Sequence, residues 1–461
     1  MKRVLHFSRL RRAHVAAAWV VLFAWTGGAR GQDVTPVLTS EHGANGAKQQ
    51  NAHYVILVSL DGFRYDYAQK YHAEHILALG VLGAAAPEGM LPSYPSLTFA
   101  NHYTLATGLY PEHHGIVANN FYDPERKRAY RMTDGSTVTD GSWYGGTPIW
   151  VLAEQQGMRA ACFFWPGSEA EIQGTRPSYY LKFDDKIPDD KRVEQVLAWL
   201  RLPAERRPHL ITLYFSDVDH AGHEYGPDSE EVRSAVQLVD KEVGVLQQGV
   251  AKLNLPVDVI VLSDHGMVKV QRDWITLDQY FPDASAFERI MSPGLYAKSD
   301  ADAQRAYEAL HGKSDKFEVY RRAQMPPNLH ADSNARSGDP VVVTNGAYLV
   351  RFSGGQPATG GTSSTAPTVL ERSQVGAHGF DWARVPEMKA SFFAAGPDIR
   401  NGVTVAPFEN VNVYPLVAKL LGLDFSHLKT GAIDGALSVL QPILKESATG
   451  NSDMDVSKPS H

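Results

Sequence analysis

Five short apolar runs recur along the chain, and stretches with helical periodicity separate them. The runs are YVILVSL (54–60), RAACFFW (159–165), HLITLYF (209–215), VDVIVLS (257–263) and KASFFAA (389–395). Continuous apolar runs of this length are typical of buried strands, and their alternation with helices is typical of a mostly parallel sheet covered on both faces. We therefore predict an α/β fold with a central, mostly parallel sheet flanked by helices.

The longest predicted helix lies between the third and fourth runs. Pro227 and Asp228 open it, and it extends to about Lys252. Its apolar positions recur at alternating steps of four and three residues, which predicts one apolar face. These positions are Val232, Val236, Val239, Val243, Leu246 and Val250.

Residues from about 273 to 372 interrupt the alternation. They contain a helix-like segment, DADAQRAYEALHG, the strand-like segments KFEVYRR and PVVVTNGAYLVRF, and the Gly/Ser/Thr-rich stretch SGGQPATGGTSSTAP. We interpret this region as an inserted α+β subdomain that ends in a mobile loop. Residues 441–461 form a polar tail, for which we predict disorder.

Residues 1–31 have the pattern of a signal peptide. A basic start, an apolar core and the small residues of GGARG follow one another. The apolar core is short for a membrane span, although an uncleaved N-terminal anchor stays open. We expect a periplasmic or secreted protein with no stable membrane span, in which residues 32–52 form a flexible segment before the folded domain.

Charge and cysteine content exclude some classes of partner and structure. Residues 1–31 carry six basic residues and no acidic one, so without them the formal charge changes from −7 to −13. This acidic balance argues against binding along a nucleic-acid duplex and leaves small phosphodiesters as possible substrates. Cys162 is the single cysteine, so an intrachain disulfide is excluded.

Aspartates follow three of the predicted strands. Asp61, Asp219 and Asp264 lie at or beyond the carboxyl ends, where ligands bind in open α/β sheets. Histidines in the segments DVDHAGH, SDHGM and GAHGFD each neighbour a glycine: His223, His265 and His378. Mixed Asp/His sets suit zinc, and two adjacent ions serve phosphoryl displacement. Each segment alone also fits an ordinary turn or polar loop, but together they predict a two-metal site.

The local structure of two of these segments can be predicted. Gly222 and the Gly226-Pro227 pair favour a loop for the segment that carries Asp219 and His223. Asp264 and His265 are adjacent, and adjacent side chains on a strand point to opposite faces. Both can therefore reach one site only if the chain leaves the strand there.

Thr98 is the candidate nucleophile. The segment after it, FANHYTLATG, is compatible with a helix, which places Thr98 near a helix N-terminus. Exposed N–H groups there favour an alkoxide and a phosphate oxygen, and a nearby divalent cation lowers the hydroxyl pKa. A simple N-cap role for Thr98 is the alternative. Asn119 could donate its amide to a phosphate oxygen, or it could be an ordinary turn residue.

Several longer segments resemble the ectonucleotide pyrophosphatase/phosphodiesterase family of the alkaline phosphatase superfamily. They include LTFANHYTLATGLYPEHHGIV, WYGGTPIWVLAEQQG, CFFWPGSEAEIQG, LSDHGM and FENVNVYPLVAKLLGL. The resemblance covers residues 53–440 and implies an alkaline-phosphatase-like catalytic domain with two Zn²⁺ ions. It implies that Asp219, His223 and His378 hold one ion, and that Asp61, Thr98, Asp264 and His265 hold the other.

The resemblance also implies roles in catalysis. Thr98 attacks phosphorus and forms a phosphothreonine intermediate that water hydrolyses, and the products are nucleoside 5′-monophosphates. Asn119 and the backbone N–H of Phe99 stabilise the charged oxygen. Phe99 and Tyr180 match positions that hold a nucleobase between two aromatic rings.

Some positions depart from the family pattern and bear on the substrate. Leu97 and Asn120 stand where the nucleotide-cleaving branch has lysines, and Ala100 replaces a proline. The interval between residues 122–124 and 148–150, however, has the length typical of that branch. We therefore predict a nucleotide phosphodiesterase. A phospholipid-headgroup (choline-type) phosphodiesterase and a catalytically silent metal-binding protein are the alternatives.

Overall fold

The computed structural model describes residues 36–291, 294–352, 375–426, 428 and 431–446. The expected signal peptide, the Gly/Ser/Thr-rich stretch and the tail after residue 446 lie outside these ranges. Within them, no helix combines the length and the apolar character needed to cross a membrane.

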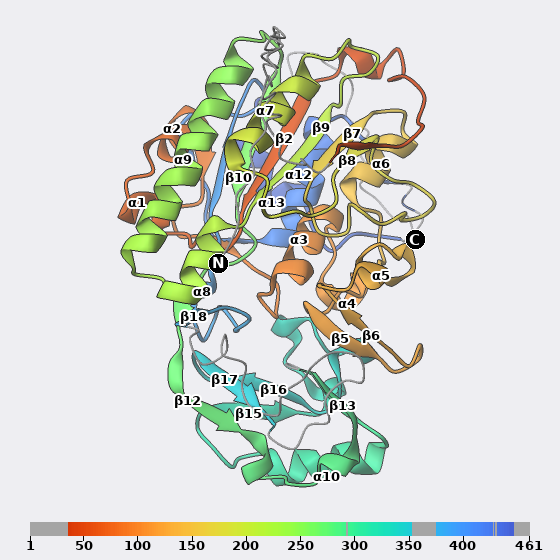
Figure 1. The fold of residues 1–461 in the computed structure, drawn as a ribbon, viewed down its shortest axis with the longest axis vertical. Helices are drawn as coiled ribbons and strands as arrows, with labels where there is room; N and C mark the ends of the chain where they lie inside the picture. Colours follow the sequence, from red (N-terminus) through yellow and green to blue (C-terminus); the bar gives the residue numbers. More distant parts are fainter. Residues whose placement is uncertain (1–35, 292–293, 353–374, 427, 429–430, 447–461) are drawn as a thin grey trace, which may run out of the picture. The chain divides into compact units, whose positions relative to one another are not determined.

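A nine-stranded sheet forms the centre of the fold (Figure 1). Its strands are, in spatial order, β1 (Leu38–Thr39), β8 (Tyr179–Tyr180), β7 (Ala160–Phe163), β9 (Leu210–Phe215), β2 (Tyr54–Leu60), β10 (Val257–Leu262), β19 (Phe392–Ala395), β3 (Ala84–Ala85) and β20 (Val403–Thr404). From β8 to β10 all neighbours are parallel, whereas β19 is antiparallel to β10. All five predicted strands lie in this sheet, and the α/β prediction is confirmed.

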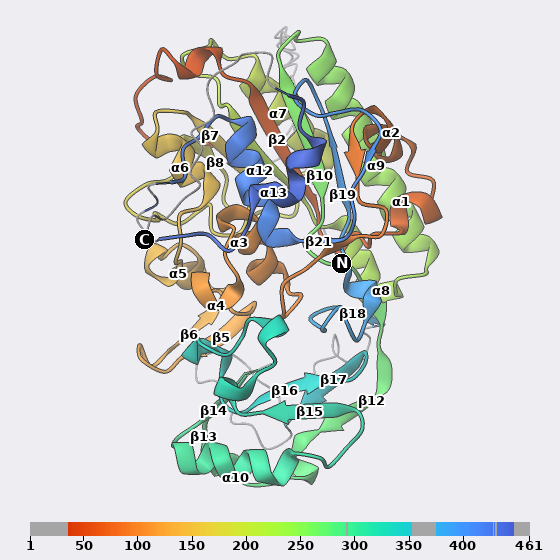
Figure 2. The ribbon, with the colours of Figure 1, turned by 180° about the vertical axis from the view of Figure 1, so that it is seen from behind.

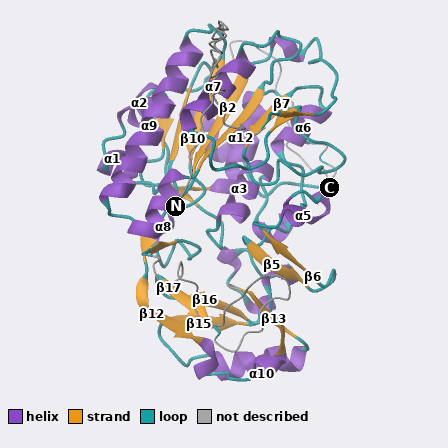
Figure 3. Ribbon diagram, in the orientation of Figure 1, coloured by secondary structure: helices purple, strands orange, loops and turns teal. Residues whose placement is uncertain are grey.

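Helices cover both faces of the sheet (Figure 3). Alternate residues of β2 point to opposite faces, so Val55 and Leu57 belong to one core and Ile56 and Val58 to the other. The first core includes residues of α3 (Thr98–Thr107), α6 (Ile149–Gln155) and α12 (Val413–Leu420), which is in view in Figure 2. The second core includes residues of α2 (Glu74–Leu82), α7 (Asp189–Leu200) and α9 (Glu230–Ala251).

Helix α9 is the predicted long helix. It begins at Glu230, slightly later than predicted, because the Ser229 hydroxyl accepts the Val232 N–H and caps the helix. All six residues of the predicted apolar stripe are buried. The periodicity therefore identified the buried face correctly.

The inserted region forms a subdomain with its own core, and the α+β prediction for it is confirmed. Its four-stranded sheet has the order β13 (Phe287–Met291), β14 (Gly294–Ala297), β16 (Val341–Thr344) and β15 (Phe317–Tyr320), accompanied by α10 (Asp300–Leu310). Next to this sheet, β12 (Gln271–Thr276) pairs with β17 (Tyr348–Arg351).

The remaining elements are short and surround the central sheet and the inserted subdomain. They are α1 (Tyr67–Lys70), β4 (Met90–Leu91), α4 (Pro111–His114), β5 (Asn120–Asp123), β6 (Arg128–Arg131), α5 (Gly135–Val138), α8 (Asp217–Tyr225), β11 (Val268–Lys269), β18 (Gly376–Ala377), β21 (Phe408–Glu409) and α13 (Leu437–Leu440).

Two segments expected to be flexible are partly held in the fold. Leu38 pairs with Tyr180 at the sheet edge, and the buried Asn45 donates to the Ala204 and Arg207 carbonyls at 2.8 and 2.7 Å. In the predicted tail, Ile443 is buried and its carbonyl accepts the Arg400 N–H at 2.7 Å. The polar composition of both segments suggested disorder. It could not reveal these contacts, because their partners are distant in the sequence.

Candidate active site

The carboxyl ends of three adjacent parallel strands bring the predicted ligands together. Asp61 follows β2, and Asp264 follows β10 after one intervening residue. Asp219 lies on α8, directly beyond β9. Because β9, β2 and β10 are neighbours, the ends of these strands form one edge of the sheet.

The segment that carries Asp219 and His223 is helical, so the prediction of a loop was wrong. It forms α8, and Gly226, with φ of 94°, ends the helix. In a helix the spacing of four residues places both side chains on one face. Glycine at 222 misled the prediction; a Cβ there would lie 2.9 Å from two atoms of the Met267 side chain, so close packing accounts for this residue.

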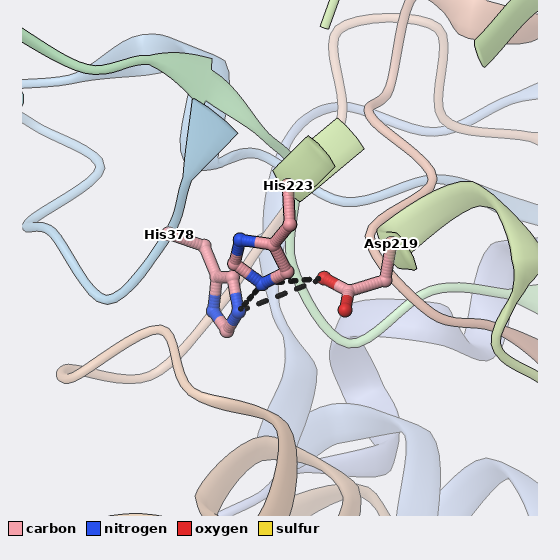
Figure 4. A group of neighbouring side chains, drawn as sticks. All are labelled: Asp219, His223 and His378. Atoms are coloured by element: carbon pink, nitrogen blue, oxygen red, sulfur yellow. Dashed lines mark hydrogen bonds and ion pairs between the residues drawn. The ribbon is translucent and has the colours of Figure 1, made fainter. Parts of the chain in front are cut away.

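Asp219, His223 and His378 form a first group of possible metal ligands (Figure 4). Asp219 Oδ1 lies 3.4 Å from His223 Nε2 and 3.6 Å from His378 Nε2. The two Nε2 atoms are 3.1 Å apart. His378 reaches the group from directly after β18.

Asp61, Asp264, His265 and Thr98 form a second group. His265 Nε2 lies 3.5 Å from Asp61 Oδ1, 2.9 Å from Asp264 Oδ2 and 3.4 Å from Thr98 Oγ1. Asp264 Oδ1 accepts the Gly62 N–H at 3.2 Å, and its Oδ2 is the oxygen that lies beside His265. Asp61, Asp219 and His265 also lie within reach of one another, which makes the two groups contiguous.

Backbone carbonyls fix the tautomer of all three histidines. The Nδ1 atoms of His223, His265 and His378 each lie 2.9 Å from a carbonyl, those of Gly376, Gly266 and Ser96 respectively. A carbonyl only accepts, so each Nδ1 carries a proton, and in the neutral ring each Nε2 presents a lone pair to the site. This is the arrangement by which proteins orient histidines that bind metals.

Carboxylate oxygens in the same place have no hydrogen-bond donor. Asp61 Oδ1, Asp219 Oδ1 and Asp264 Oδ2 are buried and have no partner among the described residues. Each lies near the Nε2 atom of a histidine, and Asp264 Oδ2 also has the Nδ1 of His102 at 3.3 Å, so the buried negative charge is compensated only in part, at a cost. Divalent cations between these atoms remove that cost, so the donor set fits a pair of metal ions.

The pKa shifts of the aspartates also favour a bound cation. Burial and the charges of Asp264 and Asp219 raise the pKa of Asp61 well above its ordinary value. Burial acts on Asp264 too, but His265 and His102 outweigh it and lower the pKa of that carboxyl. Three acidic groups that share one buried site compete for the positive charge available, and a bound cation would hold all of them ionised.

Two further residues of the site were not predicted from the sequence. The Tyr214 hydroxyl donates to Asp61 Oδ2 at 2.6 Å. His102 Nδ1 lies 2.9 Å from the Thr98 carbonyl and 3.3 Å from Asp264 Oδ2. The signals available were weak: Tyr214 is next to the end of a strand, and His102 is one helical turn from Thr98.

Thr98 is the first residue of α3, as predicted. Leu97 occupies the N-cap position and no side chain caps the helix, so the N-cap alternative for Thr98 is wrong. The Phe99 N–H donates to Asn119 Oδ1 at 2.8 Å. This contact fixes the orientation of the Asn119 amide, and its Nδ2 donates to no other described residue.

The two aromatic residues proposed for base binding are not in ring contact with each other. Phe99 contacts Tyr130, with 6.2 Å between the ring centroids, and Tyr180 lies on β8 opposite Leu38 and Cys162. Both Phe99 and Tyr180 are partly exposed and pack against the same core. Their role in binding a base therefore stays a prediction.

Comparison with known proteins identifies the family of this chain. The model of the type I phosphodiesterase / nucleotide pyrophosphatase family matches residues 55–381. An uncharacterized pyrophosphatase/phosphodiesterase of Schizosaccharomyces pombe is 36% identical over 401 residues, which are 83% of this chain and 79% of the relative.

Other relatives are longer than this chain. The human ectonucleotide pyrophosphatase/phosphodiesterase family member 1 is 33% identical over 383 residues, which are 80% of this chain and 40% of the relative. A venom phosphodiesterase of Crotalus durissus collilineatus is 34% identical, over 85% of this chain and 46% of the relative. The chain thus spans less than half of these two proteins.

A solved structure has the same fold. Murine ectonucleotide pyrophosphatase/phosphodiesterase 5, an inactive threonine-to-alanine variant in complex with AMP, superposes with a TM-score of 0.75 at 28% identity. The match covers 85% of this chain and 100% of the murine chain.

Proposed function

The chain belongs to the type I phosphodiesterase / nucleotide pyrophosphatase family of the alkaline phosphatase superfamily, and we propose that it hydrolyses nucleotide phosphodiester and pyrophosphate bonds. The products are nucleoside 5′-monophosphates, and the cofactors are two Zn²⁺ ions. The observation that carries this proposal is the set of three histidines, each oriented through Nδ1 by a backbone carbonyl, whose Nε2 atoms lie beside three buried carboxylate oxygens that have no hydrogen bond from a described residue.

The two groups of ligands would each hold one zinc ion. Asp219, His223 and His378 form one set, and Asp61, Thr98, Asp264 and His265 form the other. Bound zinc ions neutralise the phosphate oxygens and lower the pKa of the nucleophile. Zinc suits a mixed Asp/His set better than the hard oxygen-binding cations do.

Thr98 would act as the nucleophile. Its Oγ1 forms a bond to phosphorus while the bond from phosphorus to the leaving oxygen breaks, and the hydroxyl proton passes to the leaving oxygen or to solvent. In the second step the oxygen of water forms a bond to phosphorus while the bond between phosphorus and Oγ1 breaks. One proton of that water returns to Oγ1, which regenerates the threonine and releases the nucleoside monophosphate. The inactive threonine-to-alanine variant of the murine neighbour supports a threonine in this role.

Asn119 would stabilise the charge that develops on a phosphate oxygen. Its Oδ1 is held by the Phe99 N–H, so the Nδ2 group is the donor that remains for substrate. The Phe99 N–H can serve the phosphate itself only if substrate displaces Asn119 Oδ1. We therefore assign the direct contact to Asn119, with Phe99 N–H as the group that positions it.

A nucleotide is the substrate class we favour. The murine neighbour was solved with AMP, and Phe99 and Tyr180 offer partly exposed rings for a base. Leu97 and Asn120 lack the positive charge of the lysines usual in the nucleotide-cleaving branch, which keeps a phospholipid headgroup as the second candidate. Export is the expected location, either to the periplasm or out of the cell, because of the pattern in residues 1–31.

A turnover assay with the zinc-loaded chain tests the reaction and the substrate together. It compares p-nitrophenyl thymidine 5′-monophosphate, p-nitrophenyl phosphate and p-nitrophenyl phosphocholine. We expect the thymidine diester to be cleaved fastest, and Phe99→Ala and Tyr180→Ala to raise its KM while the phosphocholine KM changes little. Preference for phosphocholine would move the substrate to lipids, and preference for the monoester would contradict the role of Asn119.

The nucleophile is tested by substitution. Thr98→Ala should keep zinc but lose several orders of magnitude in turnover, because nucleophile and metal act as one unit. Thr107→Ala is the matched control, since its hydroxyl donates to the Tyr103 carbonyl one turn back on the same helix and accepts the Leu109 N–H, both away from the ligand groups. Substantial turnover by Thr98→Ala would contradict a covalent mechanism.

A further inference from the structure

Another group of possible metal ligands lies at the opposite edge of the central sheet from the candidate active site. His53 directly precedes β2, and Asp258 is the second residue of β10. Both therefore lie at the amino ends of parallel strands whose carboxyl ends carry the active site. Asp398, which follows β19, completes the group.

The three side chains have the spacing of a metal site. One ligand atom from each of His53, Asp258 and Asp398 lies within 4.8 Å of the others. His53 Nδ1 is 2.5 Å from Asp398 Oδ2, and the Asp398 N–H donates to Asp258 Oδ1 at 3.0 Å. The ligands come from three separate segments, so only the tertiary fold creates the group.

Among the three residues, Asp258 is the one whose buried carboxylate needs a partner. Its exposed fraction is 0%, and its Oδ2 has no hydrogen-bond partner among the described residues. A buried carboxylate without a partner is costly unless it binds a cation or a proton. The fold brings the loop of Asp398 very close to it: a Cβ at Gly396 would lie 2.2 Å from Asp258 Oδ1, so a larger residue there would displace the loop.

The group is partly exposed to solvent through His53 and Asp398. The side chains of His53 and Asp398 are each 38% exposed, so an ion could enter between them. The charge of Lys445 acts on Asp258, but its Nζ donates to the Pro397 carbonyl at 2.8 Å rather than to a carboxylate.

We propose that His53, Asp258 and Asp398 bind a divalent cation of the zinc class, in a structural site separate from the catalytic metals. One histidine and two carboxylates are a donor set that suits Zn²⁺, and water can fill the fourth position. The bound ion ties the start of β2, the start of β10 and the loop after β19 together. It therefore stabilises the fold and takes no part in phosphoryl transfer.

A proton shared by the two carboxylates is the alternative to a metal ion in this group. Burial and the neighbouring Asp398 charge raise the pKa of Asp258 to about 7, so Asp258 and Asp398 could share a proton near neutral pH. Zinc and a proton predict different results when the metal content of the whole protein is measured.

The test is the zinc content of the full chain and of single variants, measured by mass spectrometry after saturation with Zn²⁺ and dialysis. Asp258→Asn and His53→Gln should each bind one zinc fewer per chain than the unmodified protein. They should also lose the part of the zinc-induced rise in Tm that this site supplies. Turnover of the chromogenic diester should stay within about twofold, because neither side chain lies at the catalytic edge.

His113→Gln is the matched control. His113 Nδ1 lies 2.7 Å from Asp434 Oδ2, a similar ion pair, but among the described residues it belongs to no group of three candidate ligands. Its zinc content should equal that of the unmodified protein. Equal zinc content in all four proteins would overturn the proposal in favour of the shared proton. If Asp258→Asn fails to fold, His53→Gln decides alone, because His53 is half-exposed.

Discussion

Tyr214 provides the sharpest test of the site geometry. Its hydroxyl donates to Asp61 Oδ2 at 2.6 Å, and the side chain is 7% exposed. Asp61 Oδ1 already lacks a partner, so Tyr214→Phe leaves neither oxygen of this carboxylate hydrogen-bonded by a described side chain. The ring stays in place, and only one buried donor is removed.

The size of the effect follows from the charge on the acceptor. A hydrogen bond to a charged group contributes about 1.5–3 kcal/mol, and about 1.4 kcal/mol corresponds to a factor of ten in affinity. We therefore expect zinc to bind roughly 10- to 150-fold more weakly in Tyr214→Phe. Loss of a group that orients a metal ligand typically costs about 10–100-fold, which agrees with this range.

Zinc affinity is measured by competition with a chelator, and turnover is followed as zinc is added back. Tyr214→Phe should need more zinc for half-maximal turnover and should regain most of its rate at saturation. The control is Tyr71→Phe, which also removes a buried hydroxyl. The Pro227 carbonyl that accepts from Tyr71 still accepts a hydrogen bond from the Tyr67 hydroxyl. Unchanged zinc affinity in Tyr214→Phe would show that Asp61 is not a metal ligand, or that Tyr214 does not orient it.

Three further outcomes are expected. Burial and the charge of the neighbouring Asp217 raise the pKa of Asp189 to about 7. Between about pH 4 and pH 7 the folded protein therefore binds a proton at Asp189 that the unfolded chain does not bind, and the free energy of unfolding falls as the pH rises through this range. Asp189→Asn should therefore gain stability relative to the unmodified protein as the pH is raised from 4 to 8 in thermal melts; a constant difference would contradict this. Leu246→Ala in α9 should cost about 2–5 kcal/mol in denaturant unfolding, because the side chain is fully buried, whereas the exposed Leu238→Ala in the same helix should cost under about 0.5 kcal/mol. Removal of zinc with a chelator should abolish turnover, and Asp219→Asn should lower the zinc content as well as the rate; unchanged content would exclude Asp219 as a ligand.

Local patterns in the sequence were sufficient for much of the fold. Apolar runs identified all five predicted strands, and the stripe from Val232 to Val250 identified the buried face of α9. Local patterns also gave the positions of Asp61 and Asp264 in the fold, because the place of a residue just beyond the carboxyl end of a buried strand depends only on where that strand ends. Such features are set within a few residues and can be read without the fold.

The tertiary structure decided what depends on distant residues. It made α8 a helix where glycines suggested a loop, brought Tyr214 to Asp61, and held residues 36–52 against the rest of the chain. It also placed His53 beside Asp258, two residues that are far apart in the sequence and belong to no motif. Local periodicity determines which elements form and which face is buried. Which side chains meet across the sheet depends on strand order and packing, and no local pattern contains that information.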